Sequence, residues 1–146
     1  MGLPDAGFNA VAAYRAVAVA PASPDVSDVD GHTHPMRNLA GSLTLPPKWA
    51  LGHCPASPYI MAETINEGIP PWVLHQYPRA SFIDQTGATQ NIASYLQLDF
   101  LRCVEGWYRA VFGVLTPRQV THGGRIIMVQ LDNEMARSTG AEYRRY

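Results

Sequence analysis

The longest periodic run of apolar residues lies between residues 91 and 116. Apolar side chains recur there three or four positions apart, and this spacing places them on one face of a helix. The members of this stripe are Ile92, Leu96, Phe100, Val104, Tyr108, Val111 and Leu115. We expect one long amphipathic helix that ends at Pro117, because proline cannot continue the hydrogen bonding of a helix. Charged residues off the stripe are spaced as surface ion pairs: Asp99 with Arg102, and Glu105 with Arg109.

A second apolar run, residues 126–131, has the composition of a strand that is buried on both faces. The preceding helix predicts a crossover that lays this strand parallel to earlier strands. Asp132, Asn133 and Glu134 follow the run directly. Polar groups at the carboxyl end of a buried parallel strand are typical of active sites in α/β folds. Taken alone, these three residues favour an ordinary loop over a site, at about two in three.

The first third of the chain gives weaker signals. Residues 8–14 favour a short buried strand, and residues 24–35 are rich in the residues that form loops. His32 and His34 stand two apart in that loop. We interpret them as solvated loop residues and expect no metal site, because no third ligand is near in the sequence.

Three further segments complete the pattern. A helix is expected from about residue 36 to residue 45, where two prolines stop it. Residues 51–57 make a poor strand, because a glycine and a proline would interrupt its hydrogen-bonded ladder. Residues 76–87 have no periodic signal and are expected to form a loop.

Composition excludes several classes of protein. The chain of 146 residues can bury a core, but a complete (β/α)8 barrel needs about 250 residues. A net charge of -1 gives no basic surface for nucleic acid, and no apolar run is long enough for a membrane span. Two cysteines do not make a disulfide framework. The N-terminus lacks the features of a signal peptide, so we expect a cytoplasmic protein unless a leader lies upstream.

Ordered motifs resemble those of glycoside hydrolase family 35, the β-galactosidases. The block Val-Gln-Leu-Asp-Asn-Glu at residues 129–134 resembles the signature of the family's fourth barrel strand. The segment Gly-Phe-Asn-Ala-Val at residues 7–11, followed by Tyr14, resembles its second strand. Residues 58–63, Pro-Tyr-Ile-Met-Ala-Glu, resemble a segment that lines the galactose site. The resemblance implies an α/β fold, namely a partial (β/α)8 TIM barrel with roughly strands two to four and their crossover helices.

The resemblance also implies roles for individual residues. Glu134 would be the general acid/base, and Asn133 would contact the 2-hydroxyl of the sugar. The other substrate-binding residues that the family pattern implies are Tyr14, Met61, Ala62 and Glu63. No cofactor or metal is expected. Trp72 resembles a packing residue of the family, as does the pair Trp107 and Tyr108.

The sequence departs from the family in several places. Residues 15–23 are mostly small aliphatic residues where the family has an aromatic, proline-containing segment that can stack on sugar. Residues 136–146 match nothing that we associate with the family, so we expect a catalytic part at 1–135 and a disordered tail. A retaining glycosidase needs two carboxyl groups, and the family's nucleophile belongs to a later strand that this chain does not reach.

Three hypotheses follow. The first is a truncated retaining β-galactosidase that hydrolyses terminal β-galactosides, with the acid/base but no nucleophile; this chain alone would be a weak catalyst or none. Its partners would be a galactoside or oligosaccharide substrate and a second polypeptide that completes the barrel. The second hypothesis is a decayed, inactive remnant with at most weak galactose binding. The third is an unrelated small α/β domain that acts through protein contacts. It would be supported by a structure in which residues 125–131 do not run parallel to residues 8–14.

Overall fold

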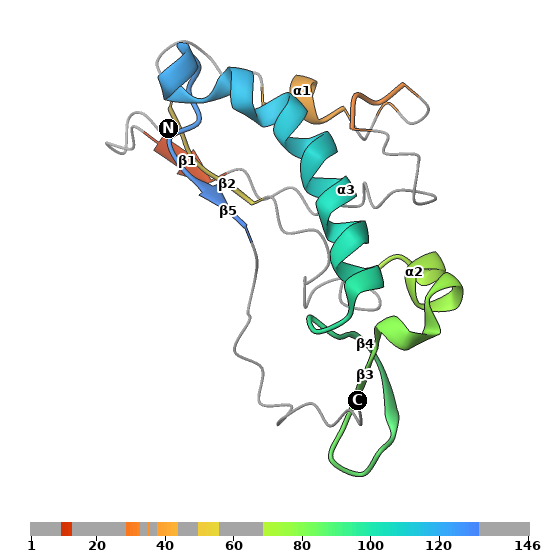
Figure 1. Ribbon diagram of the computed structural model, residues 1–146. Helices are drawn as coiled ribbons and strands as arrows, with labels where there is room; N and C mark the ends of the chain where they lie inside the picture. The colour runs from red at the N-terminus through yellow and green to blue at the C-terminus, as the bar shows by residue number, and fades with distance from the viewer. Residues whose placement is uncertain are drawn as a thin grey trace, which may run out of the picture.

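The computed structural model describes residues 10–12, 29–32, 35, 38–43, 50–55 and 69–131, and its fold class is α/β. One long helix, α3 (Leu98–Leu115), runs through the middle of the molecule (Figure 1). The helix α2 (Pro71–Gln76) and a β-hairpin lie at the N-terminal end of α3. A small parallel sheet and the helix α1 (Leu39–Ser42) lie alongside its C-terminal half.

The parallel sheet contains β1 (Ala10–Ala12), β2 (Ala50–Pro55) and β5 (Val129–Gln130) in the spatial order β1-β2-β5. Both pairings with the central strand β2 are parallel, so β1 and β5 run in the same direction. The expected parallel crossover is therefore confirmed. The observation that would have supported an unrelated α/β domain is contradicted.

The expectation that residues 51–57 make a poor strand is wrong, because β2 is the central strand of the sheet. The register explains how the strand tolerates its glycine. Val11 pairs with Leu51 but Ala12 pairs with His53, so Gly52 is an extra residue at a bulge. Pro55 is the last residue of the strand, where its missing N–H costs least.

The long helix is shorter than the apolar stripe predicts. It begins at Leu98, whereas residues 89–93 form the strand β4 (Thr89–Ala93). Ile92 therefore belongs to β4, and Leu96 lies in a turn with its side chain 57% exposed. At the other end the α-helix stops at Leu115, and the 3-10 turn η5 (Thr116–Arg118) contains Pro117. The two predicted ion pairs are confirmed, at 3.2 Å for Asp99 with Arg102 and 2.7 Å for Glu105 with Arg109.

The segment expected to be a loop, residues 76–87, contains regular structure as well. The 3-10 turn η4 (Pro78–Ala80) leads into β3 (Ser81–Ile83), which pairs antiparallel with β4. Asp84 holds the turn between these strands, because its carboxylate accepts hydrogen bonds from Thr86, Ala88 and Gln90. These donors, the Thr86 hydroxyl first, lower the pKa of Asp84 by stabilising its charged form, against an opposing effect of desolvation.

The buried residues form two clusters along one face of α3. The first joins the C-terminal half of α3 to the chain just before β5 and contains Trp107, Val111, Leu115 and Ile126. The second joins the N-terminal half to α2 and η4 and contains Ile69, Val73, Ala80 and Phe100. Trp72 packs against the second cluster. The expectations that Trp107 and Trp72 are packing residues are thus confirmed.

The run at residues 126–131 is only partly buried, so the expectation of a strand buried on both faces is wrong. Ile126 is 2% exposed, but Ile127 is 53%, Met128 61% and Leu131 55% exposed. The ladder itself is short, with β5 confined to Val129 and Gln130. Ile126 belongs to the buried cluster that includes Trp107, Val111 and Leu115 of α3, and Val129 packs against that cluster.

The helix expected from about residue 36 is also shorter than predicted and begins at Leu39. Asn38 caps it, because its side-chain oxygen accepts a hydrogen bond from the backbone N–H of Gly41 at 2.6 Å. Leu39 and Leu43 then pack against the cluster at the C-terminal half of α3. This contact attaches the segment between β1 and β2 to the same helix that precedes β5.

Candidate functional site

The six residues that the family pattern singles out lie outside the described part of the chain. They are Tyr14, Met61, Ala62, Glu63, Asn133 and Glu134. The structure does describe the strands from which three of them follow. Tyr14 comes two residues after the end of β1, and Asn133 and Glu134 come three and four residues after the end of β5.

The carboxyl ends of the three parallel strands share one edge of the sheet. β1 ends at Ala12, β2 at Pro55 and β5 at Gln130. Because all three run in the same direction and β2 lies between the other two, the chain leaves the sheet three times at this edge. In parallel α/β sheets, ligands bind beyond the carboxyl ends of the strands. This edge is therefore the candidate site.

One side chain of α3 contacts the backbone at this edge. The hydroxyl of Tyr108 donates a hydrogen bond to the backbone carbonyl of Leu131, the residue directly after β5. The Tyr108 ring is half-buried and lies 5.8 Å from the ring of Phe112, centroid to centroid. The sequence pattern identifies Tyr108 only as a packing residue. No signal in the sequence indicates that its hydroxyl bonds the chain 23 residues later.

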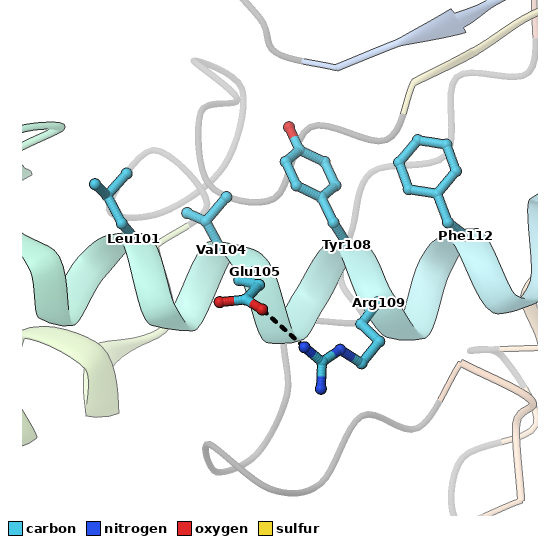
Figure 2. Close-up of a pocket in the computed structure, with 6 residues that line it drawn as sticks. All are labelled: Leu101, Val104, Glu105, Tyr108, Arg109 and Phe112. Atoms are coloured by element: carbon cyan, nitrogen blue, oxygen red, sulfur yellow. Dashed lines mark hydrogen bonds and ion pairs between the residues drawn. The ribbon is translucent and has the colours of Figure 1, made fainter.

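The surface of α3 beside Tyr108 is a shallow, mainly apolar groove. Figure 2 shows Leu101, Val104, Tyr108 and Phe112 projecting from one side of the helix, with Glu105 and Arg109 paired to each other away from them. The two charged side chains are 67% and 78% exposed, in agreement with the expectation that this face is solvated. The groove therefore offers no charged group to a substrate beyond an ion pair that is already satisfied.

Other reactive groups in the described residues do not form a site. Burial, and then the charge of Asp99, raises the pKa of the Cys103 thiol, so little thiolate is present at neutral pH. His32 is exposed, and its backbone N–H donates to the carboxylate of Asp30. Over the described ranges, no group of three His, Cys, Asp or Glu side chains is placed to hold a metal ion. None of the helices in these ranges has the length and apolar character to span a membrane.

Comparison with known proteins decides the family. The model of glycosyl hydrolases family 35 matches residues 4–146. This chain belongs to glycosyl hydrolase family 35. The family match of this family 35 chain includes residues 136–146. It therefore extends past residue 135, where the sequence pattern predicts the end of the catalytic part.

Curated relatives of this family 35 chain carry three different names. A Beta-1,2-glucosyltransferase of Ignavibacterium album is 36% identical over 115 residues, which are 76% of this chain and 16% of the relative. An Exo-beta-D-glucosaminidase of Thermococcus kodakarensis is 35% identical over 138 residues, or 89% of this chain and 17% of the relative. A Probable beta-galactosidase E of Aspergillus fumigatus is 32% identical over 77 residues, or 53% of this chain and 6% of the relative.

The chain thus spans about one sixth of the length of the first two relatives. Their matched regions cover 76% and 89% of this chain, and the family match, residues 4–146, includes β1, β2 and β5. The three strands of the parallel sheet therefore lie within the part of the chain that matches the family.

Proposed function

We propose that this chain forms part of the catalytic (β/α)8 barrel of a retaining glycoside hydrolase that removes terminal β-linked sugars. The observation that carries the proposal is the parallel order β1-β2-β5, which brings three strand ends to one edge. In this reading the three strands are strands two to four of the barrel, and their carboxyl edge is the floor of the sugar site.

The length of the connecting chain allows the proposed residues to meet. Neighbouring strands are about 5 Å apart, so β1 and β5 are separated by about 10 Å across β2. An extended residue spans about 3.5 Å, so Tyr14 can reach about 7 Å beyond β1 and Glu134 about 14 Å beyond β5. Together these two reaches exceed the separation of the two strands, and both side chains can therefore enter one cleft.

In the proposed mechanism Glu134 transfers a proton twice. Protonated, it donates to the glycosidic oxygen as the bond to the leaving group breaks; as a carboxylate, it then accepts a proton from the water that attacks the intermediate. Asn133 holds the 2-hydroxyl of the sugar, where a hydrogen bond strengthens as the transition state forms. Tyr14, Met61, Ala62 and Glu63 bind the remainder of the ring.

A retaining mechanism also needs a second carboxylate about 5 Å from the first to act as the nucleophile. We propose that this group comes from outside the 146 residues, on a second polypeptide or on further chain that completes the barrel. The exposed apolar side chains of Ile127, Met128 and Leu131 support the proposal, because a barrel strand is covered on both faces.

Two substrates are candidates. The motif at residues 129–134 supports a β-galactoside, as does the relative named Probable beta-galactosidase E. A β-D-glucosaminide is supported by the relative named Exo-beta-D-glucosaminidase, whose match covers 89% of this chain against 53% for the former. We propose the β-galactoside as the first substrate to test and the β-D-glucosaminide as the second.

The experiment combines the chain, or its Glu134→Gln variant, with the further polypeptide that supplies the nucleophile, and compares the rates on nitrophenyl β-galactoside and nitrophenyl β-glucosaminide. Glutamine keeps the size of the side chain but cannot donate an acidic proton, so the rate should fall by roughly 10²- to 10⁴-fold. The loss should be much smaller on a dinitrophenyl glycoside, because its leaving group needs little protonation. Glu142→Gln, in the segment after the strand, is the matched control and should keep the activity.

Activity that survives Glu134→Gln would refute the role of Glu134. An equal loss on both leaving groups would refute it as a proton donor while leaving a part in binding. A completed barrel that binds galactose in calorimetry but turns over neither glycoside would instead support the second hypothesis, an inactive remnant. The loss of the aromatic segment at residues 15–23 is the observation that favours that alternative.

A further inference from the structure

The hydrogen bond from Tyr108 lies directly after the point where the pairing of β5 with β2 ends. The ladder between β2 and β5 pairs Cys54 with Val129 and Pro55 with Gln130, and it extends no further in the described residues. The next residue, Leu131, has a side chain that is 55% exposed, so burial does not fix it either. Its carbonyl accepts the hydrogen bond from the Tyr108 hydroxyl.

The donor side of this bond is held firmly. Tyr108 lies in the middle of α3, next to Trp107, which is 3% exposed. The tyrosine ring packs against the buried cluster of Trp107, Val111, Leu115 and Ile126 and against the ring of Phe112. Tyrosine has few rotatable bonds and its ring is packed here, so the position of the hydroxyl relative to α3 is restricted.

We propose that Tyr108 is a positioning residue, whose hydroxyl fixes the backbone at Leu131, the residue that directly precedes Asp132, Asn133 and Glu134 in the sequence. Glu134 is only three residues further, a distance of at most about 10 Å along the chain. Catalytic groups have to be held within about 0.5 Å of their productive position, by contacts outside the reacting atoms. This inference rests on the proposed role of Glu134 for its importance to catalysis, but the anchor can be tested without any activity.

The hydrogen bond is tested in the whole chain by selective labelling of its leucine–aspartate pairs. Leucine is followed by aspartate at two places only, Leu98-Asp99 and Leu131-Asp132. A chain labelled with ¹³C at the leucine carbonyl and ¹⁵N in aspartate therefore gives two carbonyl signals in a one-bond NMR correlation. The Leu98 signal, at the first turn of α3, is the internal reference.

In the variant Tyr108→Phe, we expect the Leu131 carbonyl signal to move to lower frequency, because a carbonyl carbon loses deshielding with its hydrogen bond. The Leu98 signal should stay in place. The amide hydrogens of residues 132–134 should exchange with solvent roughly three- to tenfold faster, as expected when one hydrogen bond of ordinary strength is removed.

Phe112→Leu is the matched control, because Phe112 contacts the Tyr108 ring but takes no part in the hydrogen bond. It should leave the Leu131 signal and the exchange of residues 132–134 close to those of the unaltered chain. The proposal is overturned if Tyr108→Phe moves neither observable, or if Phe112→Leu moves both as much, since packing alone would then be the cause. A moved Leu131 signal together with full activity of Glu134→Gln would confirm the anchor and refute the proposed function instead.

Discussion

Replacing Gly124 by alanine should lower the free energy of unfolding by at least about 3 kcal/mol. A Cβ atom at Gly124 would lie 2.0 Å from the carbonyl oxygen of Arg118 and 2.1 Å from its carbonyl carbon. These are backbone atoms, and the same oxygen already accepts hydrogen bonds from Arg125 at 2.7 Å and Ile126 at 2.9 Å. The clash cannot be relieved without breaking the turn that brings the chain back toward the sheet. Urea unfolding followed by circular dichroism measures the loss.

Gly123→Ala is the matched control for that change. Gly123 has a φ of 77°, the left-handed region, but a Cβ atom there would meet nothing within 4 Å. The expected loss is therefore only the conformational penalty of about 1 to 2 kcal/mol. Equal losses at the two glycines would contradict the close approach of Gly124 to Arg118.

Leu115→Ala should lower the free energy of unfolding by about 2 to 5 kcal/mol. Leu115 is 0% exposed and belongs to the cluster that joins α3 to Ile126, so its truncation leaves a cavity between the helix and the chain that enters β5. The same urea titration measures the effect.

The variant Leu98→Ala makes the identical substitution at the other end of α3, where the side chain is 67% exposed. Its expected effect is within about 0.5 kcal/mol. If Leu98→Ala proves as damaging as Leu115→Ala, the assignment of the core to the inner face of α3 is contradicted.

Patterns that depend on local chemistry predicted the structure well. The apolar spacing from Phe100 to Leu115 and the surface ion pairs follow from helix geometry alone, and the structure confirms both. The parallel direction of β5 followed from the crossover, because a helix of this length returns the chain to the same end of a sheet. The family itself was recognised from short motifs and is confirmed over residues 4–146.

Elements that depend on tertiary contacts were predicted badly. Ile92 and Leu96 continue the helical spacing by coincidence. The strand β4 that contains Ile92 begins with three polar residues and pairs with β3. Gly52 predicts a break in a strand, yet it is the extra residue at the bulge between β1 and β2. Neither a pairing partner nor a bulge can be read from one segment alone.

The candidate site shows the same division. The sequence motifs identify the candidate site residues. The structure places the ends of β1, β2 and β5 at one edge of the sheet. The contact that joins Tyr108 to Leu131 could not be predicted, because the sequence does not show which face of α3 meets the end of β5.

The central claim is that the chain beyond β1 and the chain beyond β5 enter one cleft. It is tested by a spin label on a cysteine at position 14, Tyr14→Cys, with Cys54 and Cys103 replaced by serine. β1 and β5 are two strand spacings, about 10 Å, apart, so the label should strongly broaden the amide signal of Glu134. The amide of Gly87, in the β3–β4 hairpin at the far end of α3 (Figure 1), should stay sharp. A Glu134 signal as sharp as that of Gly87 would contradict the account.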